Sequence, residues 1–122
     1  MKNYSHLLEG TGFSKPQLQA HLKLYEGYVK KLAEISKRLE KADRSAANYS
    51  FADYSELRRR EPVAYNGVVL HELYFDGLGR KGGPPPDPAV KSKLTESYGG
   101  WEPWIADMKA AGTSCHGWAL LV

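Results

Sequence analysis

A long amphipathic helix is the feature that most constrains this 122-residue sequence. Ser14 is followed by Pro16 and Gln17, the pattern of a helix that begins with a serine N-cap and a proline in its first turn. From there to about Lys41, apolar residues recur mostly in alternating steps of four and three, the spacing of one helix face. A stripe of this length requires a second apolar surface to pack against. The stripe consists of Leu18, Leu22, Tyr25, Val29, Leu32 and Leu39, widened by Leu24, Tyr28 and Ile35.

A second helix is expected from about Asp53, after a polar connection without periodicity. Pro62 either kinks this helix or marks the first turn of a fresh one. The residues after Pro62 are densely apolar, and Gly77 and Gly79 are typical of a helix C-terminus. Two antiparallel helices that bury their apolar stripes against each other are the simplest architecture for this half of the chain.

A cluster of glycine and proline at residues 79–86 is the one credible domain boundary. We therefore expect a helical hairpin domain at residues 1–80. Residues 81–122 are expected to form a linker and the beginning of a second domain.

Two short helices and a strand are expected beyond the boundary. The first helix is capped by Asp87 and runs to about Tyr98. The second covers residues 101–111 and ends at Gly112. Residues 117–122 form a continuous apolar run that predicts a buried strand, which needs partners for its backbone groups. The predicted fold class is mainly α, with one C-terminal strand.

Composition excludes several classes of function. No apolar run approaches the roughly 20 residues of a membrane helix, and the first ten residues do not form a secretory signal, so a cytoplasmic location is the default expectation. Cys115 is the single cysteine, which excludes an internal disulfide and a thiolate metal cage. A nucleic-acid binder would rest only on the net charge of +3, and the basic run at 58–60 is flanked by Glu56 and Glu61, which favours a solvated helix face.

The four histidines, His6, His21, His71 and His116, match no zinc-finger or H-E-x-x-H spacing. His21 lies beside the stripe of the first helix and His71 lies in the apolar part of the second, so antiparallel packing can bring both imidazoles into one interhelical site. Two facing imidazoles suit a transition metal. The alternative is that each is a hydrogen-bonded core or boundary histidine, and spacing alone favours this alternative.

The sequence resembles the iron/manganese superoxide dismutase family in five segments that occur in the family's order. The segment HLKLYEGYV, at residues 21–29, resembles the metal-ligand helix, in which a ligand histidine is followed by a tyrosine-valine pair. The segment NGVVLHELYF, at residues 66–75, resembles the second ligand helix. The glycine and proline crossover comes next. YGGW at 98–101 resembles an aromatic-Gly-Ser-aromatic turn, and GWALL at 117–121 resembles the first strand of the C-terminal α/β domain.

The resemblance implies dismutation of superoxide to oxygen and hydrogen peroxide at one iron or manganese ion per chain. It implies that His21 and His71 are two of three histidine ligands. Tyr28 would lie near the substrate entrance, and Trp118 would line the metal pocket. His116 lies near the position where the family often has a catalytic glutamine. The alternative is a catalytically degenerate relative that keeps the hairpin as a structural or interaction module.

The sequence departs from the family pattern at several points. From His21 to Tyr28 the spacing is one residue shorter, a rotation of about 100° on an ideal helix, which a π-type bulge in the longer version could absorb. Leu24 and Tyr25 stand where the common pattern has histidines, and Gly100 replaces serine. The family's remaining ligands come from an Asp-x-Trp-Glu-His type motif downstream, which this sequence does not contain. The family is commonly dimeric, and an unpaired C-terminal strand would also favour association, so a homo-oligomer is expected.

Overall fold

The computed structural model describes residues 1–9, 11–78 and 87–122. The chain divides into two compact units, residues 1–82 and 83–122. The boundary predicted between residues 80 and 81 lies outside the described residues and stays a prediction. Among the described residues, no helix is long and apolar enough to cross a membrane.

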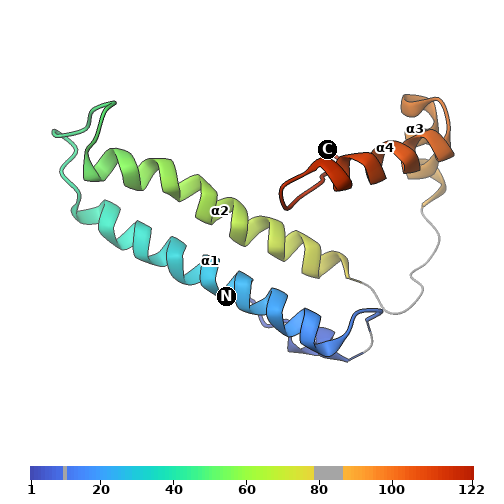
Figure 1. Cartoon of the computed structure of the whole chain (residues 1–122), viewed down its shortest axis with the longest axis horizontal. Helices are drawn as coiled ribbons and strands as arrows, with labels where there is room; N and C mark the ends of the chain where they lie inside the picture. Colours follow the sequence, from blue (N-terminus) through green and yellow to red (C-terminus); the bar gives the residue numbers. More distant parts are fainter. Residues whose placement is uncertain (10, 79–86) are drawn as a thin grey trace. The chain divides into compact units, whose positions relative to one another are not determined.

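The first unit is a hairpin of two long helices, α1 (Lys15–Lys41) and α2 (Asp53–Gly77), preceded by a short 3-10 helix, η1 (Ser5–Leu8). The two helices lie side by side and run in opposite directions (Figure 1). The Ser14 side chain accepts a hydrogen bond from the backbone N–H of Gln17, as its sequence pattern predicts. The prediction of an antiparallel helical hairpin is confirmed.

Pro62 lies inside α2, which continues through it as a single helix. Pro62 is exposed. The buried residues Leu57 and Ala64, on either side of it, pack into the interhelical core. This packing supports the helix across the backbone hydrogen bond that proline cannot make. Of the two interpretations that the sequence allowed, a fresh helix at Pro62 is therefore wrong.

The hairpin core consists of two clusters. One lies near the closed end and contains Ile35, Leu39, Leu57 and Ala64. The other contains Tyr25 and Phe75 from the helices together with Tyr4 and Leu7 from the N-terminal segment. The N-terminal segment, residues 1–9, thus completes the second cluster, because a two-helix hairpin alone leaves one side of its apolar seam exposed.

The second unit contains α3 (Pro88–Tyr98) and α4 (Trp101–Ser114), which pack against each other. The Asp87 side chain caps α3 by accepting from Ala89 N and Val90 N. Gly99 ends the helix in the left-handed region, at φ 73°.

The prediction that Gly112 ends the last helix is wrong, because α4 continues to Ser114. The hydroxyl groups of Thr113 and Ser114 donate to the carbonyls one turn back, at Lys109 and Ala110. One glycine costs a helix only about 1 kcal/mol, which does not suffice to end α4 at this position.

The predicted strand at residues 117–122 is not formed. These residues belong to neither helix nor strand, and Leu120 and Leu121 are largely exposed. A strand needs a neighbouring strand for its backbone groups, and no segment within the described ranges is one. The mainly α fold class is confirmed without the strand.

Candidate metal centre

His21 of α1 and His71 of α2 face each other across the hairpin. Their ring centroids are 4.8 Å apart, with the ring planes at 68°. His71 is almost completely buried, whereas His21 is half-buried. The antiparallel helices therefore bring two imidazoles to one point, and their role as metal ligands stays a prediction.

The orientation of His71 is set by its own helix. Its Nδ1 lies 2.5 Å from the carbonyl oxygen of Gly67, one turn earlier. Because a carbonyl can only accept, Nδ1 carries the hydrogen, and a neutral ring then has its lone pair on Nε2. Metal-bound histidines commonly donate their second N–H to a backbone carbonyl in this way. The arrangement of His71 thus fits a metal ligand that binds through Nε2.

His21 is biased toward the neutral form that metal binding requires. Burial lowers its pKa below the ordinary value of 6.5, and the nearby His71 lowers it further. An unprotonated imidazole at neutral pH retains a lone pair for coordination. A pair of imidazole donors suits iron and other first-row transition metals.

Aromatic rings surround the two histidines. Tyr74 and Phe75 have ring centroids 5.0 and 5.1 Å from that of His21. The ring of Tyr28 lies 5.4 Å from that of His71. These rings form an apolar wall that strengthens electrostatic interactions inside the site. The structure brings Tyr28 next to the histidine pair, and its catalytic role stays a prediction.

A hydrogen-bonded network that the sequence analysis missed lies beside the pair. Tyr25 Oη donates to Glu72 Oε1 at 2.6 Å and accepts from the backbone N–H of Lys2 at 3.0 Å. Lys2 Nζ contacts Glu72 Oε2 at 3.3 Å and Asp76 Oδ2 at 2.9 Å. Tyr4 Oη donates to Asp76 Oδ1 at 2.9 Å. The network joins the N-terminal segment to both helices.

Titration properties follow from these contacts. The hydrogen bond from Tyr25 is the largest cause that lowers the pKa of Glu72. Burial, followed by the hydrogen bond to Asp76, raises the pKa of Tyr4 to about 12. The Glu72 carboxylate is therefore charged at neutral pH, whereas the Tyr4 hydroxyl is protonated.

Comparison with known proteins decides the family. The chain is 42% identical over 114 residues to an iron superoxide dismutase of Aquifex aeolicus, a match that covers 90% of this chain and 54% of the relative. It is 35% identical over 115 residues to an iron superoxide dismutase of Cupriavidus metallidurans, covering 91% of this chain and 56% of the relative. The chain belongs to the iron/manganese superoxide dismutase family.

The superoxide dismutase relatives also include a manganese protein of Haloferax volcanii, 36% identical over 62 residues, which are 49% of this chain and 31% of that relative. No family model matches the chain. The chain spans about half the length of the superoxide dismutases that match most of it.

The other residues singled out by the superoxide dismutase resemblance, His116 and Trp118, lie in the second unit. Their roles stay predictions. Among the described residues, no group of three or more His, Cys, Asp or Glu side chains could hold a metal ion. Within the described part of the chain, the histidine pair is thus an incomplete donor set.

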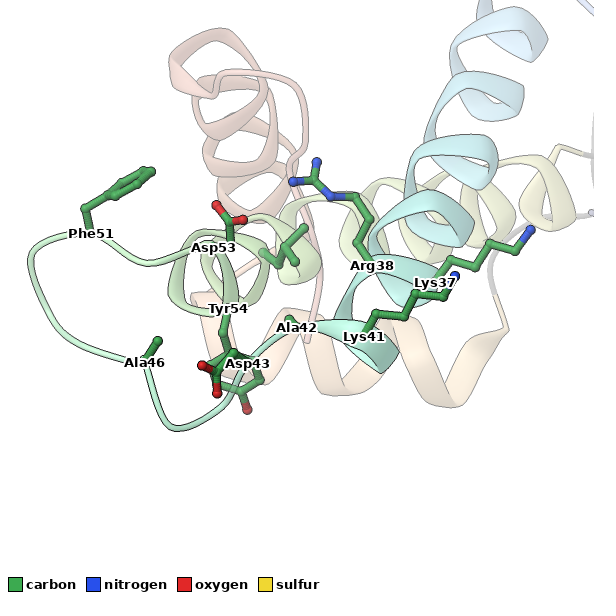
Figure 2. Close-up of a pocket in the computed structure, with 10 residues that line it drawn as sticks. Lys37, Arg38, Lys41, Ala42, Asp43, Ala46, Phe51, Asp53 and Tyr54 are labelled. Atoms are coloured by element: carbon green, nitrogen blue, oxygen red, sulfur yellow. The ribbon is translucent and has the colours of Figure 1, made fainter.

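A hollow of about 650 Å³ lies at the closed end of the hairpin and not at the histidines. Lys37 of its lining is sixteen residues from His21, roughly 24 Å along a helix. Figure 2 shows Lys37 and Lys41 extending away from Asp43 and Tyr54 instead of converging on a common point. The hollow therefore lacks a focused set of ligand-binding groups.

Proposed function

We propose that the chain supplies two ligands, His21 and His71, to a mononuclear iron or manganese site that dismutates superoxide. The observation that carries the proposal is the contact between the two rings, with centroids 4.8 Å apart, in a chain that matches iron superoxide dismutases over 90% of its length. The reaction converts two superoxide ions and two protons into oxygen and hydrogen peroxide. When bound, the metal supplies the one-electron step, taking an electron from one superoxide and giving it to the next.

Residues of the chain would orient the substrate and the protons. Tyr28, whose ring packs against His71, is the candidate for a hydrogen-bonding group near the substrate entrance. His116 is proposed as a second hydrogen-bonding residue of the completed site. The buried Gly67 carbonyl holds the Nδ1 hydrogen of His71, so that Nε2 stays available to the metal in the active tautomer.

Positive charge beside Tyr28 favours an anionic substrate. A hollow of about 250 Å³ there is lined by Lys31, Arg38 and Arg60, with Glu34 as its single acidic residue. Glu34 is paired with Lys31, which leaves a net positive lining. Clefts lined by one sign of charge raise the local concentration of oppositely charged substrates.

A second candidate function is a catalytically degenerate module that keeps the hairpin for a structural role. The observation that favours it is the lack of a third ligand near the pair among the described residues. The two candidates differ in superoxide decay.

The decisive experiment is metal analysis of the chain after reconstitution with Fe(II) or Mn(II), together with an assay of superoxide decay. We expect one ion per chain in the wild type and in the control His6→Ala, which removes an exposed histidine. The ion should be lost from His71→Ala and from His71→Gln, with circular dichroism verifying that each variant is folded. Equal metal in folded His71 variants contradicts the proposal, and bound metal without superoxide decay favours the degenerate module.

A further inference from the structure

The hydrogen bond between Tyr25 and Glu72 connects α1 and α2 directly beside the histidine pair. Tyr25 follows His21 by four residues, so the two side chains lie on the same face of α1, one turn apart. Glu72 follows His71 immediately on α2. The 2.6 Å bond therefore spans the interhelical gap within one turn of both rings.

Lys2, in the N-terminal segment, contacts both residues of the Tyr25–Glu72 hydrogen bond. The Lys2 backbone N–H donates to Tyr25 Oη, and Lys2 Nζ pairs with the second carboxylate oxygen of Glu72. Tyr25 is 2% exposed, so its hydroxyl has few routes to water. One residue of the N-terminal segment thus satisfies both partners of the interhelical bond.

We propose that Tyr25 and Glu72 are positioning residues that set the spacing of His21 and His71, with Lys2 holding them in register. Neither residue is one of the proposed ligands. The Tyr25 ring lies 6.2 Å from the ring of His71, and Glu72 is the residue that follows His71 on α2. The inference rests on the proposed function for the identity of the ligand. It adds that the N-terminal segment is part of the support of the metal site.

A second bond of similar geometry offers a matched control. Tyr4 Oη donates to Asp76 Oδ1 at 2.9 Å, and Tyr4 is also buried. This bond attaches the same N-terminal segment to α2, but Asp76 lies five residues beyond His71 and the bond does not involve α1. The Tyr4 hydroxyl contacts α2 alone, at Asp76 and at the backbone carbonyl of Glu72, so its loss should disturb the spacing of the two histidines less than loss of the Tyr25 hydroxyl, which joins α1 to α2.

The test compares Tyr25→Phe, Glu72→Gln and Tyr4→Phe in the whole chain, with Co(II) as the metal and its visible absorption as the measure of affinity. Removal of a group that orients a ligand histidine typically costs at least about tenfold in metal affinity. We expect Tyr25→Phe to weaken Co(II) binding by about tenfold. Glu72→Gln, which keeps an acceptor for the Tyr25 hydroxyl, should retain most of the affinity, and Tyr4→Phe should stay within about twofold of wild type.

A second measurement needs no metal. Carbon-proton correlation spectra of the metal-free chain report the ring signals of His21 and His71, and the contact between the rings gives a nuclear Overhauser effect. We expect Tyr25→Phe to shift both sets of signals and weaken the contact, and Tyr4→Phe to leave them in place.

Two results would overturn the inference: unchanged affinity and ring signals in Tyr25→Phe, or equal losses in Tyr25→Phe and Tyr4→Phe. If Tyr25→Phe does not fold, Glu72→Leu, which removes the acceptor of the Tyr25 hydroxyl from the α2 side, takes its place, and unchanged affinity and ring signals in folded Glu72→Leu overturn the inference. A wild type that binds no Co(II), but whose ring contact weakens in Tyr25→Phe, removes the proposed function and leaves the positioning role standing.

Discussion

Gly67 of α2 packs directly against the ring of Tyr28 of α1, so closely that a Cβ atom at position 67 would overlap three atoms of that ring. The same glycine carries the carbonyl that accepts from His71 Nδ1. Gly67 therefore has two roles that both depend on a close approach of the helices. Its small size lets the tyrosine ring lie over the helix backbone, and its carbonyl fixes the ligand candidate.

We predict that Gly67→Ala destabilises the hairpin even though alanine favours helix. Overpacking in a well-packed contact costs about 1–3 kcal/mol. The gain in helix propensity is only about 1 kcal/mol. The expected net loss in the free energy of unfolding is on the order of 1 kcal/mol, measurable by urea denaturation followed by circular dichroism.

Gly27→Ala is the matched control, because Gly27 lies inside α1 with nothing near the position of a Cβ atom. It should raise stability by about 1 kcal/mol. In a Tyr28→Ala background the overlap disappears, and Gly67→Ala should then also be stabilising. The same loss from Gly67→Ala in both backgrounds would show that the Tyr28 ring is not the cause.

The sequence predicts the starts of the helices well, because a capping residue bonds to the backbone a few positions along the chain. Ser14 with Gln17 marked the start of α1, and Asp87 with Pro88 marked the start of α3, because capping depends on residues a few positions apart. Gly112 does not end α4, because it does not adopt the positive φ of a glycine C-cap and one glycine costs a helix only about 1 kcal/mol. The prediction of a strand at residues 117–122 is wrong because a strand needs a neighbouring strand to bond its backbone groups, and an apolar run alone does not show that such a neighbour exists.

The sequence predicts the contact between the two histidines but not the residues that surround and orient them. The positions of His21 and His71 on two apolar stripes indicated that they could meet, and the rings do meet. The roles of Gly67 and of the Tyr25–Glu72 bond depend on the rotation of each helix about its axis, which the sequence pattern does not specify. The spacing of Tyr25 from His21, one helical turn, together with the adjacency of Glu72 and His71, was the signal that could have identified the network.

We predict that the contribution of Asp76 to stability is lost in acid. The Lys2 ammonium, and after it the Tyr4 hydroxyl, hold the pKa of Asp76 below its ordinary value of 3.8. Because the pKa in the folded state is lower than in the unfolded state, ionised Asp76 stabilises the fold above pH 3.8. That contribution disappears as the pH falls below 3.8 and through the folded-state value.

Thermal unfolding of Asp76→Asn against wild type between neutral pH and about pH 2.5 measures this contribution. The variant should melt at a lower temperature than wild type at neutral pH, and the gap should close in acid. A difference between Asp76→Asn and wild type that is independent of pH would contradict the assignment.

The three tryptophans, Trp101, Trp104 and Trp118, all belong to the second unit, so tryptophan fluorescence reports on that unit alone. Neither α3 nor α4 contains a buried residue, whereas the hairpin has two buried clusters. Segments with few buried apolar contacts unfold at low free energy. We therefore expect the fluorescence transition to occur at a lower urea concentration than the circular dichroism transition, and to have a shallower slope. Helices α1 and α2 contribute most of the circular dichroism signal. Coincident transitions would mean that the whole chain unfolds as one cooperative unit, which contradicts the prediction.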